Sequence, residues 1–247
     1  MLLPLYFMVP LIAFLYASVG FGGATGYLAA MSFLGVPPQI MASTALLLNI
    51  LVSGISFSSF YRAGHLKRGL LLPFLLTSVP AAFLGGYFKI TAEFYSILLY
   101  AVLTFVAFRL LFFSRKSDDN RPIRPLPLQW ALVIGLGIGV LSGMVGIGGG
   151  IFLSPVIIFA RWGTGKQASA VAAAFILLNS FSGLAGRFIG GTFQLDAFSL
   201  SLIPVGLIGA LLGSYWGAIR FTGLALRRAL GMVMSFAVSN FWWMFWR

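Results

Sequence analysis

The sequence contains no cysteine, and only four of its 247 residues are acidic. The lack of cysteine excludes disulfides, thiolate catalysis and cysteine-bound zinc or iron–sulfur sites. The single histidine, His65, lies in a basic loop, so the apolar segments hold no base for a serine nucleophile and no set of metal ligands. The sequence therefore predicts neither an enzyme nor a bound cofactor.

Charge is also scarce: 8% of the residues are charged, 60% are hydrophobic, and the mean hydropathy is +1.02. A soluble domain carries about 25% charged residues. A lipid bilayer can face apolar side chains directly, and a spanning helix needs about 20 apolar residues, so this length accommodates roughly eight spans. We expect an all-α integral membrane protein of about eight transmembrane helices.

The apolar residues form long continuous runs. They are too long for the strands of a membrane barrel, which would show alternating stretches of about 10 residues. The predicted runs cover residues 2–34, 40–61, 70–88, 94–113, 128–160, 168–189, 197–219 and 224–245. The first run lacks a basic start and is interpreted as a retained membrane segment, not a cleaved signal. Trp242, Trp243 and Trp246 are interpreted as an anchor at the membrane interface.

Basic residues lie in the short connections, as expected where Lys and Arg mark the cytoplasmic side. On an eight-span count, ten of them, including Arg62, Arg124 and Arg187, share the side of both termini, and six, including Lys89 and Arg161, lie opposite. The count favours both termini inside, although re-entrant hairpins would change it. We expect a multi-pass protein of a bacterial inner membrane, with the bilayer and not nucleic acid as its partner; a homodimer stays open.

The two halves of the sequence resemble each other. The run from Val19 to Ala24 (VGFGGA) matches the run from Val145 to Gly150 (VGIGGG), an offset of 146 − 20 = 126 residues. Leu-Leu-Asn at positions 47–49 recurs at 177–179, and Leu-Gly-Gly-Tyr at 84–87 recurs as Leu-Gly-Ser-Tyr at 212–215. We therefore divide the chain into a first transmembrane repeat (1–113), a charged connector (114–127) and a second repeat (128–247), each repeat holding four helices.

The glycine-rich stretches are predicted to break helices at membrane depth. Glycine reaches φ > 0, and irregular backbone in lipid is tolerated only where protein or a polar cavity surrounds it. Paired breaks in duplicated halves are typical of transporter binding sites, and a restarted helix offers free N–H groups to an anion. The candidate substrate-binding residues at the breaks are Gly20, Gly22, Gly23, Thr25, Gly146, Gly148, Gly149 and Gly150.

Asn49 and Asn179 occupy matched places within spans and complete the candidate site. Each amide can donate hydrogen bonds to a ligand, or can instead bond between helices. Isolated glycines such as Gly135 and Gly139 are interpreted as helix-packing positions. Arg187 lies near the end of the sixth run, where we favour a side chain that reaches to the interface over one that attracts an anion.

The segment from Val145 to Val156 (VGIGGGIFLSPV) resembles the signature of the TauE/SafE sulfite-exporter family, and Val19–Gly26 resembles a degenerate copy. In the first copy, Ala24-Thr25 replaces the third glycine and the bulky residue after it. The resemblance implies a permease for sulfite, sulfonates or related small organic anions.

The predicted spans contain no carboxylate, and this independently favours an anion over a cation as the substrate. The acidic residues all lie in connections or at span ends: Glu93, Asp118, Asp119 and Asp196. The leading hypothesis is a secondary transporter that works by alternating access. The alternatives are a channel-like anion pore and a non-transporting membrane scaffold.

Overall fold

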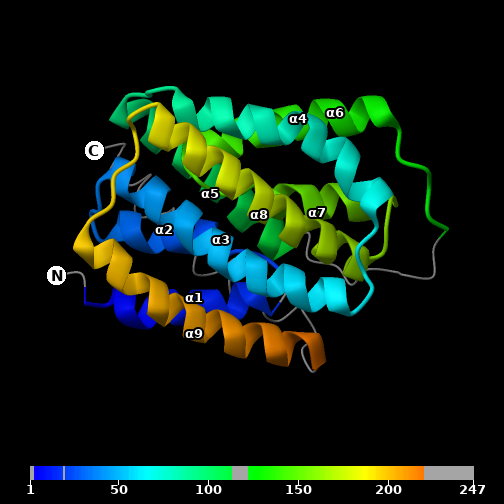
Figure 1. The fold of residues 1–247 in the computed structure, drawn as a ribbon, viewed down its shortest axis with the longest axis horizontal. Helices are drawn as coiled ribbons and strands as arrows, with labels where there is room; N and C mark the ends of the chain where they lie inside the picture. The colour runs from blue at the N-terminus through cyan, green and yellow to red at the C-terminus, as the bar shows by residue number, and fades with distance from the viewer. Residues whose placement is uncertain (1–2, 19, 113–121, 220–247) are drawn as a thin grey trace.

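Helices account for most of the folded chain. A computed structural model describes residues 3–18, 20–112 and 122–219 of the protein, and these ranges contain helices and no strand (Figure 1). The prediction of an all-helical chain is therefore confirmed for this part. The helices described are α1 (Leu5–Ala17), α2 (Ala24–Phe33), α3 (Pro38–Arg62), α4 (Arg68–Tyr87), α5 (Ala92–Phe112), α6 (Leu128–Val145), α7 (Gly150–Phe159), α8 (Gly165–Ile189) and α9 (Ala197–Ile219).

Five of the described helices, α3, α4, α6, α8 and α9, are long and apolar enough to cross a membrane, and α1, α5 and α7 are shorter apolar helices. Large apolar side chains such as Phe7, Leu76 and Val133 are exposed on the outside of the bundle. Contact of such a surface with lipid is favourable, whereas its contact with water costs free energy. Three predicted features lie outside the described residues. They are the eighth apolar run, the tryptophans near the C-terminus, and residues 113–121, which hold the end of the first repeat and part of the connector.

Each glycine-broken run turns back on itself. A Cβ atom on Gly26 in α2 would come within 2.5 Å of Ile12 in α1, so these two helices lie side by side. A Cβ on Gly149 would likewise come within 2.5 Å of Ile138, seven residues before the end of α6. We call the pairs α1–α2 and α6–α7 re-entrant hairpins, because each reverses at its glycine break and returns to the end of the bundle where it began (Figure 1). Helix α6 itself runs along α4 and is long enough to cross a membrane.

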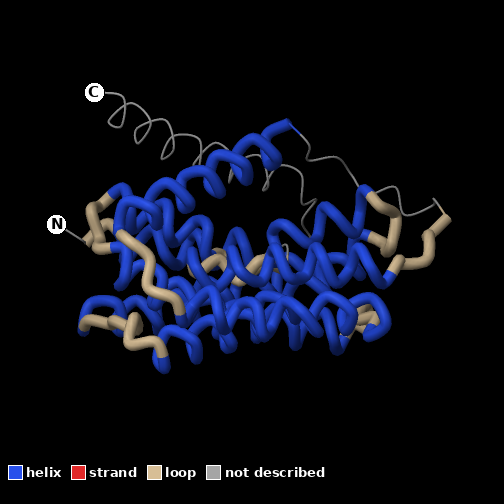
Figure 2. Tube along the Cα trace, turned by 90° about the horizontal axis from the view of Figure 1, so that it is seen from above, coloured by secondary structure: helices blue, strands red, loops and turns tan. Residues whose placement is uncertain are grey.

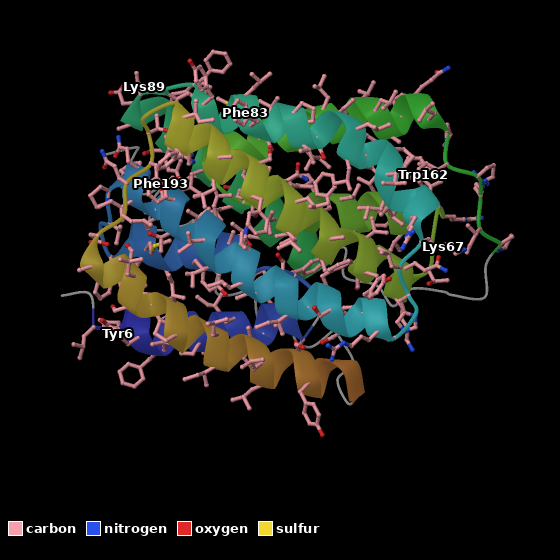
Figure 3. The ribbon with its side chains drawn as sticks, in the orientation of Figure 1. Tyr6, Lys67, Phe83, Lys89, Trp162 and Phe193 are labelled. Carbon is pink, nitrogen blue, oxygen red and sulfur yellow. The ribbon has the colours of Figure 1, made fainter. Side chains whose placement is uncertain are left out.

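The two hairpins enter from opposite ends of the bundle. Tyr6, at the start of α1, hydrogen-bonds to Ser201 at the start of α9, on the end that also carries Lys89 and Phe193 (Figure 3). We call this the Lys89 end. The start of α6 is at the opposite end, the Lys67 end, which carries Lys67 and Trp162. The long helices run between these ends, as the view from above in Figure 2 also shows.

This arrangement corrects the eight-span orientation count. The count placed Arg161 on the side opposite to Arg124. In the structure both lie at the Lys67 end, where the carbonyl of Arg161 accepts a 2.7 Å hydrogen bond from the N–H of Arg124. Arg187 and the start of α1 lie at the Lys89 end, although the count placed them with Arg62. Hydropathy detects an apolar run but not a reversal within it, so both re-entrant hairpins were counted as crossings.

The halves of the chain interlock. Helix α4, from the first half, packs most extensively on α6 and α8 of the second half. Its sequence counterpart α9, from the second half, packs on α1 and α3 of the first. Eight of the described helices divide into a first bundle of α1, α2, α3 and α9 and a second bundle of α4, α6, α7 and α8. Helix α3 packs on α8 more extensively than on any helix of its own bundle.

Glycine makes these crossings possible. A Cβ on Gly143 in α6 would fall 2.0 Å from the carbonyl oxygen of Ala82 in α4, and a Cβ on Gly213 in α9 would fall 2.1 Å from that of Phe14 in α1. Gly135 and Gly139 meet the backbone of α4 in the same way. The interpretation of Gly135 and Gly139 as packing positions is confirmed, since small residues let helix backbones approach closely in membranes.

Substituting Gly143 with alanine should destabilise the protein. The added methyl group would overlap the backbone of α4, and overpacking of this kind costs roughly 1–3 kcal/mol, or more where the backbone cannot yield. Gly137→Ala is the matched control, because a Cβ at that position in the same helix meets nothing within 4 Å. Thermal unfolding of both variants in detergent measures the difference. Equal melting temperatures would contradict the proposed close packing of α4 on α6.

Candidate functional site

The two glycine breaks meet in the interior of the molecule. The cavity between them has a volume of about 10 Å³, which is just enough for a single water molecule. Its walls come from both halves of the chain: they are Tyr16, Phe21, Gly22, Gly23, Ala24, Thr25, Ile147, Ile151 and Ile176. The structure therefore shows the centre of the molecule closed.

Left-handed backbone forms both breaks. Gly23 has φ 94° and immediately precedes α2, and Gly149 has φ 80° and immediately precedes α7. Residues with a Cβ rarely adopt these angles, so glycine is required here by conformation as well as by space. Gly146, with φ 90°, ends α6 in the same way, as the sequence predicted for a break at this position.

Asn49 ties the two breaks together. Its Oδ1 accepts a hydrogen bond of 3.1 Å from the N–H of Ala24, the first residue of α2. Its Nδ2 donates a hydrogen bond of 3.0 Å to the carbonyl oxygen of Ile147 in the second break. The side chain is fully buried, and a Cβ on Gly22 would lie 2.3 Å from its Oδ1. One amide thus satisfies broken backbone from both halves of the chain.

Asn179 does not reproduce this role, although its sequence position matches that of Asn49. Its Nδ2 donates a hydrogen bond of 2.9 Å to the carbonyl of Phe175 in its own helix. Its Oδ1 is buried and has no hydrogen-bond partner among the described residues. The neighbouring residue, Ser180, approaches the second break instead: a Cβ on Gly148 would lie 2.9 Å from its hydroxyl. The site is therefore asymmetric in the state described.

Buried hydroxyls face each break. The hydroxyl of Tyr27 lies against Gly23, and that of Ser180 lies against Gly148. Neither has a hydrogen-bond partner within the described part of the chain. Thr25, a predicted site residue, has its hydroxyl 2.7 Å from that of Tyr16. Leaving a buried hydroxyl unpaired costs about 1–3 kcal/mol. Other buried hydroxyls, such as those of Ser78 and Ser142, are likewise unpaired among the described residues.

Sequence reasoning missed Tyr16 and Tyr27 as neighbours of the breaks. A signal was present for Tyr27, because it follows Gly23 by four residues and one helical turn returns its side chain to the start of α2. The position of Tyr16 depends on the reversal of the chain, which composition does not reveal. Gly20 lies farther out, where a Cβ would meet the ring of Phe60 at 2.8 Å.

The interpretation of Arg187 as an interfacial side chain is wrong. Arg187 is 6% exposed and donates hydrogen bonds through Nη2 to the carbonyls of Gly143 (3.2 Å) and Met144 (2.6 Å). These carbonyls belong to the last turn of α6, where the helix dipole favours a cation. The guanidinium is therefore held inside the protein, beside the approach to the second break.

Long apolar helices and paired glycine breaks that meet in the interior are typical of a multi-pass membrane transporter. The chain belongs to the sulfite exporter TauE/SafE family, whose sequence pattern matches residues 5–241. The resemblance inferred from the glycine motifs is thereby confirmed over nearly the whole chain.

Two relatives are themselves described as transporters. The "probable membrane transporter protein y4hK" of Sinorhizobium fredii (strain NBRC 101917 / NGR234) is 37% identical over 209 residues, covering 82% of this chain and 84% of its own. The "probable membrane transporter protein YunE" of Bacillus subtilis (strain 168) is 24% identical over 225 residues, covering 79% and 81% respectively. No solved structure matches this chain.

The unequal roles of the two asparagines predict unequal effects on stability. Asn49→Ala should leave the N–H of Ala24 and the carbonyl of Ile147 buried without partners, at roughly 1–3 kcal/mol each. Asn179→Ala removes only a bond within its own helix and should cost much less. Chemical or thermal unfolding of the two purified variants gives the comparison. An Asn179→Ala variant as unstable as Asn49→Ala would show that Asn49 is not the bridge between the breaks.

Proposed function

We propose that the protein is a secondary transporter for a small anion, such as sulfite, a sulfonate or a related organic anion, and that it works by alternating access. The observation that carries this proposal is the meeting of two opposed helix starts, α2 and α7, at one buried cavity lined by both repeats. Helix N-termini present N–H groups and the positive end of the helix dipole, and both features favour an anion.

The distribution of charge supports the choice of an anion over a cation. Glu93 is exposed in the first turn of α5, and Asp196 lies just before α9, so no described acidic side chain lies near the central cavity. An unpaired cation held at mid-membrane costs several kcal/mol. An anion has the helix starts and the hydroxyls of Tyr27 and Ser180 as partners. These partners carry no full charge, which leaves the site weak enough to release its cargo.

Alternating access requires two bodies that move relative to each other. We infer that these bodies are the two interlocked bundles, not the two halves of the sequence, since α4 and α9 each pack with the opposite half. Movement at the contact of α3 with α8 would open the central cavity toward one end and then toward the other. In the opposite state, the unpaired Oδ1 of Asn179 would accept the N–H at the start of α7, as Asn49 does for α2.

The ends of the bundle also suggest an orientation in the bacterial inner membrane. Arg62, Lys67, Arg68, Arg124, Arg161 and Lys166 gather toward the Lys67 end. Basic residues beside spans favour the cytoplasmic side, so we place the Lys67 end in the cytoplasm. On this view the chain has about eight membrane-crossing or re-entrant units in two inverted repeats.

Flux measurements in liposomes test the proposal. The purified protein should carry at least one of sulfite, thiosulfate, sulfonates and short carboxylates, and should carry no metal or organic cation. Uptake should saturate and should be accelerated by the same anion loaded inside, since counterflow separates a transporter from a channel-like pore. Cation flux with every anion inert would overturn the proposal. No flux of any kind would favour a non-transporting scaffold.

A leucine at Gly148 should abolish transport. Any Cβ at this position lies within 3.0 Å of Ile176, Asn49 and Ser180, and a larger side chain would fill the contact between the two breaks. Gly35→Leu is the control for backbone strain: Gly35 has φ 74°, close to the 76° of Gly148, but a Cβ there meets nothing within 4 Å. Uptake by liposomes containing equal amounts of folded protein is measured. Normal uptake by Gly148→Leu would contradict the assignment of the breaks to the substrate path.

A further inference from the structure

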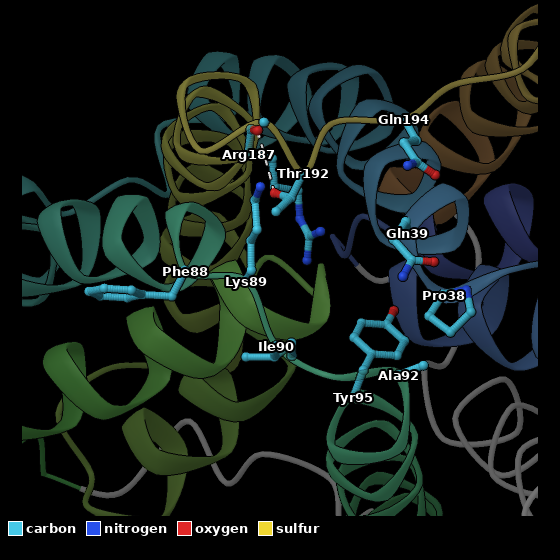
Figure 4. A pocket seen from close by; sticks show the side chains of 11 residues that line it. Pro38, Gln39, Phe88, Lys89, Ile90, Ala92, Tyr95, Arg187, Thr192 and Gln194 are labelled. Carbon is cyan, nitrogen blue, oxygen red and sulfur yellow. Dashed lines mark hydrogen bonds between the residues drawn. The ribbon is translucent and has the colours of Figure 1, made fainter.

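We propose that a basic pocket at the Lys89 end is the mouth through which the anion reaches the second glycine break. The pocket has a volume of about 250 Å³ and lies between the start of α3, the α4–α5 loop, the start of α5 and the end of α8 (Figure 4). It is distinct from the central cavity and shares no lining residue with it.

Two residues that line the pocket are hydrogen-bonded to the end of α6. Arg187 lines the pocket and hydrogen-bonds to the carbonyls of Gly143 and Met144. From another wall, the hydroxyl of Tyr95 donates a 3.0 Å hydrogen bond to the carbonyl of Val145. The next residue is Gly146, where the second break begins. An anion in this pocket is therefore separated from the break by one short turn of backbone and the two side chains bonded to it.

One nitrogen of Arg187 is buried without a hydrogen-bond partner among the described residues. Its side chain is more than nine-tenths buried, its Nη2 is bonded to α6, and its Nε has no hydrogen-bond partner among the described residues. A buried guanidinium without a carboxylate partner is unfavourable, and an oxyanion is the group that its planar donors fit best. This unpaired nitrogen is a second observation, independent of the cavity itself, that points to an anionic ligand.

Lys89 provides the second charge of the pocket. It is exposed on the loop between α4 and α5 and lines the same pocket as Arg187 (Figure 4). The described acids at this end are Glu93 and Asp196, and neither lines the pocket. Hydrogen bonds from Ser199 hold the pKa of Asp196 below its usual value, and its carboxylate accepts the N–H of Ser199 at 2.8 Å, near the start of α9. The field inside the pocket is therefore positive.

The remaining walls indicate the class of anion. The amides of Gln39 and Gln194 provide polar contacts, and the side chains of Pro38 and Ile90 provide apolar ones. A volume of about 250 Å³ exceeds what a bare inorganic oxyanion fills. A small organic oxyanion, with a sulfonate or carboxylate head and a short carbon chain, matches both the charged and the apolar parts. This inference rests on the proposed function and adds to it a point of entry.

Because the chain has no cysteine, a thiol introduced at position 89 would be the only one. We expect Lys89→Cys to lower uptake of a short-chain sulfonate at subsaturating concentration by roughly tenfold, with little change at saturation, since positive charge acts mainly on the encounter. A methanethiosulfonate reagent carrying trimethylammonium should restore most of the rate, and one carrying a carboxylate should lower it further. Excess substrate should slow both modifications.

Lys67→Cys is the matched control, because Lys67 is a basic loop residue at the opposite end of the bundle. Its modification should change uptake less than twofold at physiological ionic strength, where charges more than about 8 Å away are screened. If the wild-type protein takes up the anion but both cysteine variants respond equally to the two reagents, the pocket is not the mouth. The proposed transport function would then still stand. A wild-type protein that carries no anion would instead overturn the proposed function on which the mouth rests.

Discussion

The structure depends on how broken backbone is satisfied in the interior of a membrane protein. Water is not available there, so every N–H and C=O released by the glycine breaks must find a partner in the protein or in a ligand. Asn49 satisfies one group from each break and thereby holds the tips of both hairpins against each other. This amide therefore links the two halves of the chain at the centre of the molecule.

Along the proposed path, full positive charges lie at the mouth and only neutral groups lie at the centre. At the Lys89 end, Lys89 and Arg187 carry full positive charges that attract an anion from water. At the centre, the groups available are helix starts and the neutral hydroxyls of Tyr27 and Ser180. Strong charges at the mouth raise the local concentration of the anion, whereas weak dipoles at the centre bind it without trapping it. A transporter needs both properties.

The interlocking of the halves constrains how the protein can move. Close backbone contacts such as Gly143 with Ala82 and Gly213 with Phe14 join helices from different halves within each bundle. The motion of whole bundles proposed above keeps these contacts intact. The contact of α3 with α8 carries Asn49 on one helix and Asn179 on the other, so the bundle interface and the candidate site coincide.

The sequence predicted the parts of this structure that local composition controls. Apolar runs located α3, α4, α5, α8 and α9 to within three residues, and clustered glycines located both breaks. Hydropathy does not record the direction of the chain, so it could not predict the reversals at the glycine breaks. For the same reason it could not predict at which end of the bundle Arg161 and Arg187 lie. The matched positions of Asn49 and Asn179 predicted that both lie near the breaks, but their hydrogen bonds differ, because only Asn49 bonds to backbone of both breaks.

Anomalous diffraction from protein crystals grown with selenite, the heavier analogue of sulfite, tests the central claim most directly. The account predicts a selenium peak within hydrogen-bonding distance of the first turn of α2 or α7, close to the hydroxyl of Tyr27 or Ser180. The cavity should be larger than in the closed state described here. If selenite is transported but its peak lies away from both glycine breaks, the anion does not bind where the two hairpins meet, and the account is contradicted.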